Sequence, residues 1–300
     1  MKLVVIGASY AGLNLLKSLG GNFSKSIVCL DKYPYKKNLL LEFLVGSISS
    51  KELLFERDFF NLPQVDYVFS KKALRINTNK GKVFTEDRQS LEYDILIIAT
   101  GSRPKYLSCP GVHKRGVVSL YTLEDIKYIK DVIDFSSHVV MYTQTNLGLR
   151  ILSFLKEKAL DFKIISTSEH FAKYSIDNQE LINEERVILD VEVSEIIGNG
   201  DVKALRLSSG KIIACDLFIV DTGLKPNLEI VRNTDIVYEE AIFVDDNFST
   251  NIENIFALGD VINKDLPGLK DFSGQISQIS SQVSCLKEVI SHRFPLTPLT

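Results

Sequence analysis

The 300-residue sequence has few cysteines, no long apolar run and no excess of charge of one sign. Its four cysteines, Cys29, Cys109, Cys215 and Cys285, form no C-x-x-C pair, so we expect neither a disulfide framework nor a metal site. Apolar runs such as residues 93–100 are much shorter than the roughly 18 residues of a membrane-spanning helix. The first apolar stretch is too short for a signal peptide. The sequence therefore predicts a soluble, cytoplasmic protein without a transmembrane span.

Clustered charges and nucleophilic constellations are also missing. Lys plus Arg is 35 and Asp plus Glu is 38, which gives a formal charge of −3 with no block of like charge. A surface that reads phosphates needs clustered cations, so nucleic acid is excluded as the main partner. No Cys/His or Ser/His/Asp set is evident, and the histidines fall in predicted loops or at element ends. We interpret them all as surface residues: His113, His138, His170 and His292.

Short apolar segments typical of buried strands alternate with segments of helical pattern. The expected strands are residues 3–6, 27–31, 95–99, 139–142 and 163–165, and the expected helices are residues 11–19 and 147–158. Wholly apolar strands separated by helices indicate a parallel sheet that is covered on both faces. The predicted fold class is therefore α/β.

The order of strand, helix, strand, meander and buried strand occurs twice. Turn-rich, alternating sequence at residues 71–91 predicts an antiparallel meander, and a similar stretch recurs at residues 191–213. A chain of this length can hold two domains. We predict two Rossmann-like dinucleotide-binding domains, one inserted in the other, each with a central parallel sheet and an antiparallel meander. The first is residues 1–108 with 236–300, and the second is residues 109–235.

Residues 4–12 have the pattern of a strand that runs into a tight turn and opens a helix. Gly7 permits the turn, Gly12 lets the helix approach the strand, and the amides at the helix start can hold a pyrophosphate. The middle position of the G-x-G-x-x-G pattern is Ser9, which is small and can donate a hydrogen bond to phosphate. Asp31 would accept a hydrogen bond from an adenosine ribose. The alternative is a helix cap with a surface aspartate.

Two later motifs resemble the FAD-dependent pyridine nucleotide-disulfide oxidoreductase superfamily. Residues 99–104 (Ala-Thr-Gly-Ser-Arg-Pro) are similar to the strand that leaves the family's FAD domain, and residues 250–260, which end in Leu-Gly-Asp, are similar to its late FAD motif. Residues 31–48 look most like the type II NADH dehydrogenases and sulfide:quinone reductases, without the redox cysteines of disulfide reductases. Residues 102–125 are similar to the NADH oxidase branch. The resemblance covers residues 2–290.

The resemblance implies FAD as the cofactor of the first domain and an NAD(P)-binding-like fold for the second. It assigns Asp260 to the ribityl chain. It also places the start of the final helix, near residues 273–276, beside the flavin N1–O2 edge, where the positive helix end would stabilise the reduced ring by about 1 kcal/mol. The residues assigned to FAD binding are Gly7, Ser9, Tyr10, Ala11, Gly12, Asp31, Lys32, Leu74, Ala99, Thr100, Gly101, Arg103, Gly259, Asp260, Gln275 and Ile276.

The second dinucleotide motif departs from the family pattern. Of its three glycines only Gly148 remains, because Thr143 and Thr145 occupy the other two positions. The acid expected after the next strand is replaced by residues 166–168, Ser-Thr-Ser. We therefore expect NAD(P)H to bind weakly or not at all. The family's C-terminal interface domain is also expected to be absent, which leaves the oligomeric state open.

Flavin chemistry needs no protein nucleophile, since the cofactor carries the reaction. Lys36, Lys37 and Glu42 are the candidates to approach flavin N5, with a solvated lysine pair as the alternative. Cys109 is the candidate reactive thiol. The other residues singled out are Cys29 and Cys215, read as core, and three aromatic residues that either line the flavin cavity or pack: Tyr35, Phe43 and Tyr106.

Two functions stay open at this point. In the first, which is our main interpretation, FAD accepts electrons from NAD(P)H or another small donor and passes them to an acceptor without a redox disulfide. In the second, the chain is an FAD-containing redox or assembly subunit that a partner protein supplies with electrons. The retained two-domain plan, including residues 221–227, favours the enzyme, whereas the altered second motif favours the subunit. The sequence does not define the acceptor.

Overall fold

The chain forms two compact units in the computed structural model, each described here by itself. Residues 1–19, 23–29, 34–158, 161–174, 186–262 and 272–295 are described, without the side chains of residues 272–277. The first unit comprises Met1–Lys36, Leu54–Arg103 and Lys225–Thr300, and the second comprises Lys37–Leu53 and Pro104–Leu224. Residues 37–53 thus group with the second unit. The predicted division into binding domains concerns which cofactor each part holds, and it stays a prediction.

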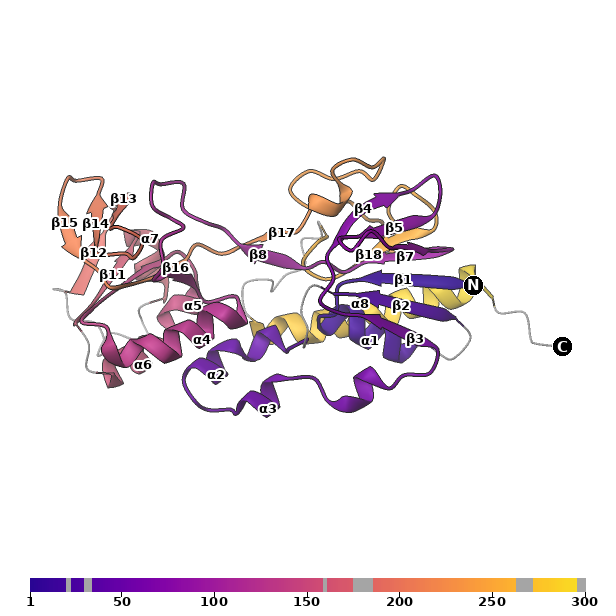
Figure 1. Ribbon diagram of the computed structural model, residues 1–300, viewed down its shortest axis with the longest axis horizontal. Helices are drawn as coiled ribbons and strands as arrows, with labels where there is room; N and C mark the ends of the chain where they lie inside the picture. Colours follow the sequence, from indigo (N-terminus) through magenta and orange to yellow (C-terminus); the bar gives the residue numbers. More distant parts are fainter. Residues whose placement is uncertain (20–22, 30–33, 159–160, 175–185, 263–271, 296–300) are drawn as a thin grey trace. The chain divides into compact units, whose positions relative to one another are not determined.

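The first unit is built on a parallel five-stranded sheet in the order β18-β7-β1-β2-β3 (Figure 1). Its strands are β1 (Lys2–Ile6), β2 (Ser24–Val28), β3 (Val65–Val68), β7 (Ile95–Ile98) and β18 (Ile255–Ala257). Every residue of β7 and β18 is buried, which is why both strands are wholly apolar. The antiparallel sheet β4-β5-β6 precedes β7 in the chain, with bounds Ala73–Asn77, Lys82–Thr85 and Ser90–Glu92.

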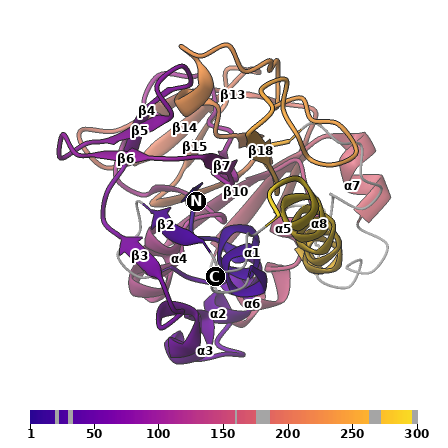
Figure 2. The ribbon, with the colours of Figure 1, turned by 90° about the vertical axis from the view of Figure 1, so that its right-hand side faces the viewer.

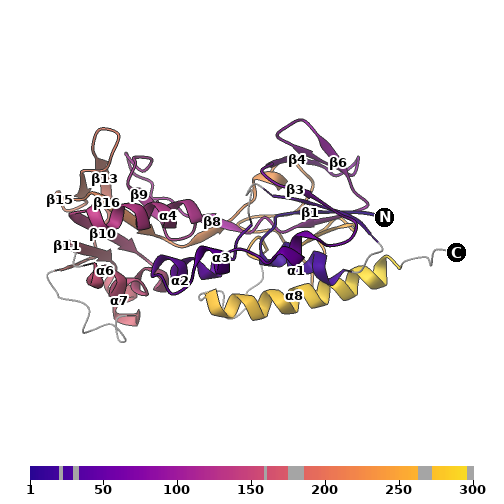
Figure 3. The same cartoon turned by 60° about the horizontal axis from the view of Figure 1, so that its bottom comes forward.

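Two helices of the first unit lie side by side, as Figures 2 and 3 both show. They are α1 (Tyr10–Ser18), which directly follows β1, and α8 (Phe272–Arg293) near the end of the chain. Helix α1 buries Leu13, Leu15 and Leu16, and α8 buries Leu286 and Ile290 in the same apolar core. Burial of these leucines fixes α1, and with it the turn that precedes α1, against the sheet. Short 3-10 turns complete this unit: η2 (Arg57–Phe60) and η6 (Glu229–Val231).

The second unit repeats this topology. Its parallel sheet has the order β12-β11-β10-β16-β9, and the antiparallel sheet β13-β14-β15 precedes β16 just as β4-β5-β6 precedes β7. The strands are β9 (Val117–Ser119), β10 (His138–Thr143), β11 (Asp161–Ser166), β12 (Val187–Leu189), β13 (Val193–Ile197), β14 (Ala204–Leu207), β15 (Ile212–Ala214) and β16 (Leu217–Asp221). The predicted duplication, and the α/β class with parallel sheets and meanders, are therefore confirmed.

The helices of the second unit are short. They are α2 (Leu40–Leu44), α3 (Ser50–Leu53), α4 (Leu123–Val132), α5 (Asn146–Leu149), α6 (Leu152–Glu157) and α7 (Ser168–Tyr174), with 3-10 turns η1 (Lys37–Leu39) and η3 (Ile133–Phe135). Strands β8 (Ser102–Pro104) and β17 (Leu224–Pro226) pair as a two-stranded sheet where the chain passes between the units. No helix among the described residues is long and apolar enough to cross a membrane.

Two predicted elements differ from the structure. Strand β2 begins at Ser24 and ends at Val28, earlier than the predicted residues 27–31. Polar Lys25 is almost fully buried within it because its Nζ donates to the Leu19 carbonyl at 2.8 Å, a contact that no periodicity reveals. The predicted helix at residues 147–158 is two helices, α5 and α6, since the Ile151 amide bonds to the Gly148 carbonyl three residues back.

The buried sheet of the second unit supplies a stability test. Phe218 on β16 is fully buried, whereas Phe135 is 87% exposed. We expect Phe218→Ala to lower the free energy of unfolding by about 3–5 kcal/mol, because it leaves a cavity, and Phe135→Ala to change it by less than about 0.5 kcal/mol. Urea unfolding followed by circular dichroism measures both. Equal losses in the two variants would contradict the described core.

Candidate functional site

The turn between β1 and α1 requires glycine at two positions. Gly7 has φ of +114°, and a Cβ atom there would lie 2.1 Å from the carbonyl oxygen of Ala99, at the end of the neighbouring strand β7. A Cβ atom on Gly12 would lie 2.0 Å from the Gly7 carbonyl oxygen. Both glycines are therefore needed for the close approach of the turn, the helix and strand β7, as the sequence predicted. We call Gly7, Ser9, Gly12 and Ala99 the first turn.

The start of α1 presents unused hydrogen-bond donors. Ser9 occupies the N-cap position with extended backbone, yet its side chain makes no capping hydrogen bond. Within the described residues the amides of Ala11 and Gly12 have no acceptor, and the first bond into the helix runs from the Leu13 amide to the Ser9 carbonyl at 3.0 Å. Free amides at the positive end of a helix bind anions. The first turn therefore fits the pyrophosphate of a dinucleotide.

The late motif lies directly against this turn. Gly259 has φ of +79°, and a Cβ atom there would lie 3.4 Å from the Cβ of Ala11 on α1. Its amide donates to Oε1 of buried Gln282 on α8 at 2.8 Å. The next residue, Asp260, accepts from the Ser102 hydroxyl at 2.8 Å. Segments from the start, the middle and the end of the chain thus meet around the start of α1.

Asn227 forms three hydrogen bonds to the backbone and side chain of the segment that follows β7. Asn227 donates its side-chain amide to the Thr100 carbonyl at 2.8 Å and its backbone amide to the Gly101 carbonyl at 2.9 Å. Thr100 in turn donates its hydroxyl to the Asn227 carbonyl at 3.0 Å. Arg103 pairs with Glu229 at 2.5 Å. These bonds fix the backbone at Thr100 and Gly101 beside the first turn, so Asn227 is a positioning residue that the sequence motifs did not single out.

Several other predicted cofactor residues differ in burial and in how much of them the structure describes. Asp31 and Lys32 lie outside the described residues, and Gln275 and Ile276 belong to α8 without described side chains. Leu74 on β4 is 54% exposed. Tyr10 opens α1 and packs partly buried on the core. The assignment of these residues to a cofactor stays a prediction.

Two of the three candidates for flavin N5, Lys36 and Glu42, form ion pairs. Lys36 pairs with Glu56 at 2.6 Å, whereas the third candidate, Lys37, opens the short turn η1. Glu42 on α2 pairs through Oε1 with Arg150 at 3.1 Å, while its Oε2 is buried without a hydrogen-bond partner among the described residues. The Lys36 side chain is 21% exposed, so the ion pair decides neither for an approach to flavin N5 nor for a solvated lysine pair, and the assignment stays a prediction.

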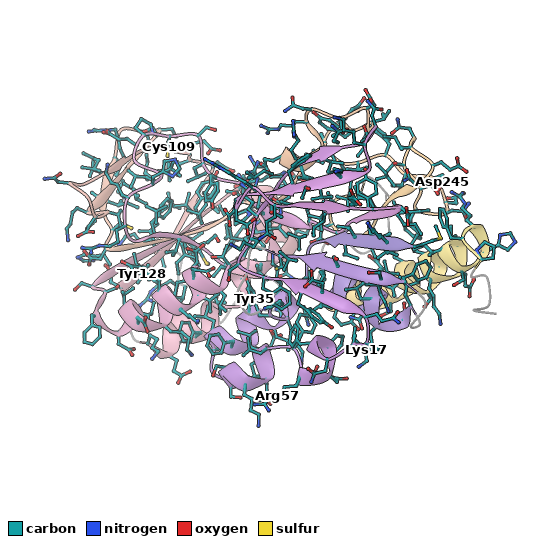
Figure 4. All side chains as sticks on the ribbon, turned by 45° about the vertical axis from the view of Figure 1, so that its right-hand side comes forward. Lys17, Tyr35, Arg57, Cys109, Tyr128 and Asp245 are labelled. Atoms are coloured by element: carbon teal, nitrogen blue, oxygen red, sulfur yellow. The ribbon has the colours of Figure 1, made fainter. Side chains whose placement is uncertain are left out.

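The cysteines and aromatic residues divide into core and surface. Cys29 and Cys215 are buried, as predicted, and burial raises the pKa of the Cys215 thiol to about 12. Figure 4 marks Cys109 on the connection before β9, where partial burial also raises its pKa. A raised pKa leaves less thiolate, which argues against a reactive thiol. Among the aromatic candidates, Tyr35 is buried and Tyr106 is 56% exposed. The third, Phe43, lies beneath the ammonium of Lys130.

His170 differs from the predicted surface position. It is half-buried on α7, and its Nδ1 lies 2.8 Å from the Ser166 hydroxyl. Since that hydroxyl donates its one hydrogen to the Thr143 carbonyl, Nδ1 is the donor toward Ser166. Burial lowers the pKa of His170, so the ring is neutral at pH 7. The prediction failed here because the packing of α7 against β11 has no signal in a seven-residue helix.

In the second turn Thr143 and Thr145 replace two of the family's glycines and Gly148 keeps the third. A carboxylate fills this turn. Asp221 at the end of β16 is fully buried and accepts hydrogen bonds from both threonine hydroxyls and from Tyr121. Sequence reasoning quoted Asp221 only as part of a connecting loop. The one available signal was an acidic residue directly after the wholly apolar stretch 217–220.

Each unit has its own parallel sheet, and in the first unit a glycine turn follows the central strand β1 and opens helix α1; these features define a protein of the dinucleotide-binding α/β class. The family model of pyridine nucleotide-disulphide oxidoreductases matches residues 1–283. The chain belongs to this family, whose members are FAD-dependent oxidoreductases, so the family resemblance and the FAD assignment are confirmed at that level.

The curated relatives include electron-transfer proteins. The chain is 26% identical over 273 residues to the assimilatory nitrate reductase electron transfer subunit of Bacillus subtilis, covering 86% of this chain and 35% of that protein. It is 26% identical to rhodocoxin reductase of Rhodococcus erythropolis, covering 89% and 66%. The chain therefore spans only a third to two thirds of these relatives. A solved NAD-dependent persulfide reductase from A. fulgidus shares the fold, with a TM-score of 0.84, 24% identity, and coverage of 99% and 60%.

The raised pKa of Cys109 gives a pH test. Because the protonated thiol is favoured, alkylation of Cys109 by iodoacetamide should be slower at pH 8 than that of a small free thiol, and its rate should rise at a higher pH. Mass spectrometry of the Cys109 peptide across a pH series measures this. A midpoint below that of the free thiol would instead identify an activated cysteine.

Proposed function

We propose that the chain is an FAD-dependent oxidoreductase that accepts electrons on the flavin and passes them to an acceptor without a redox disulfide. The first turn carries the proposal, since its glycines admit a pyrophosphate against free helix amides. Bound FAD would supply the redox chemistry of its isoalloxazine ring. The first turn would hold the pyrophosphate, and Asp260, oriented by Ser102, would bind the ribityl chain.

A protein redox partner is the proposed acceptor. The relatives named for nitrate reductase electron transfer and rhodocoxin reduction support an acceptor of this kind. The four cysteines are free thiols, and this agrees with a reducing cytoplasm as the proposed location. Among the described residues no three His, Cys, Asp or Glu side chains form a metal-ligating group.

A second candidate function is a flavin subunit that receives electrons from a partner protein rather than from NAD(P)H. The observation that favours it is the buried Asp221 carboxylate, which occupies the second turn. The two candidates share FAD and differ in the electron donor.

Removal of the close approach at Gly7 tests the cofactor. We expect wild-type protein reconstituted with FAD to be yellow, with absorbance near about 450 nm, and Gly7→Ala to lose most of that flavin because its Cβ would meet the Ala99 carbonyl. Gly210→Ala is the matched control: Gly210 has φ of +84° but nothing lies within 4 Å of its added Cβ. Heat release and chromatography identify the cofactor.

The two variants separate backbone strain from blocked space. If both lose flavin equally, positive φ alone is responsible and the pyrophosphate assignment loses its support. Wild-type protein that stays colourless after reconstitution, while circular dichroism shows it folded, would overturn the proposed function.

A further inference from the structure

Strand register makes the two turns directly comparable. In the first unit Ile6 pairs with Ile98, so Gly7 lies opposite Ala99. In the second unit Thr143 pairs with Asp221. Thr143 therefore occupies the position of Gly7, and Asp221 occupies the position of Ala99. The two changes face each other, and the Thr143 hydroxyl donates to Oδ2 of Asp221 at 2.8 Å.

Asp221 has the hydrogen-bond partners of a bound anion. Its fully buried carboxylate accepts from the hydroxyls of Thr143 and Thr145 at 2.8 Å and from the Tyr121 hydroxyl at 2.5 Å. It also accepts from the backbone amide of Gly148 at 2.8 Å. Burial and the adjacent carboxylate raise the pKa of Tyr121, which therefore stays a donor. A carboxylate only accepts, so four donors satisfy it fully.

The amides that would hold a pyrophosphate are occupied. In the first turn the corresponding amides at Ala11 and Gly12 have no acceptor within the described residues. In the second turn the Leu147 amide donates to the Thr145 hydroxyl oxygen at 3.1 Å, and the Gly148 amide donates to Asp221. The amides at the start of α5 are thus capped by the side chains of Thr145 and Asp221.

The space for a phosphate is filled as well. A Cβ atom on Gly148 would lie 2.5 Å from the Thr143 hydroxyl oxygen and 3.0 Å from Oδ2 of Asp221, so both side chains pack directly on the helix start. The methyl group of Thr145 packs on Gly223, where an added Cβ would lie 3.5 Å from it. A phosphate placed here would displace these side chains and face the Asp221 charge.

The position predicted to recognise the adenosine ribose also differs. Val28 and Ile165 have equivalent partners in the two sheets, and counting three residues on from each along the sequence aligns Ser168 with Asp31. Ser168 donates its backbone amide to Asp190 at 2.8 Å, and its hydroxyl donates to the same carboxylate. His170, the ionisable side chain on α7 that faces the turn, is neutral and brings no positive charge. NAD(P)H does not fit the residues of the second unit.

We propose that Asp221 is an internal anion that takes the place of a dinucleotide pyrophosphate in the second unit and excludes NAD(P)H from it. One consequence of this inference rests on the proposed flavin function: if the chain carries a redox-active flavin, a donor other than a nicotinamide dinucleotide bound in the second unit reduces it. The exclusion itself is a property of the second turn and can be measured without reduction of the flavin.

The test is direct binding of NAD+ and of NADP+, which carry the same pyrophosphate but cannot reduce the flavin, to FAD-reconstituted protein, measured by isothermal titration calorimetry. Wild-type protein should give no saturable heat up to about 1 mM nucleotide, a range that covers ordinary enzyme affinities. The variant Thr143→Gly/Thr145→Gly/Asp221→Ala removes the anion and reopens the turn. It should bind at least one of the two nucleotides about tenfold or more tightly than wild type.

The control is Asp216→Asn. Asp216 directly precedes β16, whereas Asp221 is the last residue of that strand. Asp216 also accepts two backbone amides, from Ser137 and His138, and its loss should leave nucleotide binding unchanged. Asp221→Asn, which keeps the shape and removes the charge, should give an intermediate gain and serves if the triple variant does not fold by circular dichroism. Saturable wild-type binding, or no gain in a folded variant, would overturn the exclusion. Flavin content, read separately, reports on the proposed function.

Discussion

The absence of one methyl group at Gly7 is the constraint on which the first unit depends. Strand β7 passes so close to the turn that any side chain at Gly7 would meet the carbonyl of Ala99. This approach brings the start of α1 and the segment after β7 together, while Gly259 packs on Ala11 from the late motif. Within the part of the chain that the structure describes, the amides of Ala11 and Gly12 have no acceptor, and this arrangement fits an anion at the turn.

The second unit shows what happens to the same architecture when that constraint is relaxed. Thr143 at the position of Gly7 brings a hydroxyl into the turn, and Asp221 at the position of Ala99 brings a carboxylate that satisfies it. A buried carboxylate that lacks hydrogen-bond donors costs about 1–3 kcal/mol or more, and here Asp221 has donors from Thr143, Thr145 and the Gly148 amide. Together, and with Tyr121, they form a closed network. The pair of substitutions thus preserves the fold of the unit while it removes the anion site.

Most elements were predictable because strand and helix periods are local. The parallel strands at residues 95–98 and 217–221 and the two meanders follow from apolar runs and turn residues. Strand β2 and the broken helix α5–α6 were not, because their bounds depend on single hydrogen bonds that leave no periodic pattern in the sequence. Buried Lys25 donates to the Leu19 carbonyl, and the break after α5 lies where the Ile151 amide bonds to the Gly148 carbonyl.

The sequence alone determined the fold class, the duplication and the family motifs, including the glycines of the first turn, because these depend on backbone geometry that only certain residues allow. Tertiary structure alone decided the role of Asp221 and Asn227, and the half-buried position of His170. The side chains of Asp221 and Asn227 meet partners 73 to 127 positions away, and Asp221 becomes an internal anion only because sheet register sets it opposite Thr143.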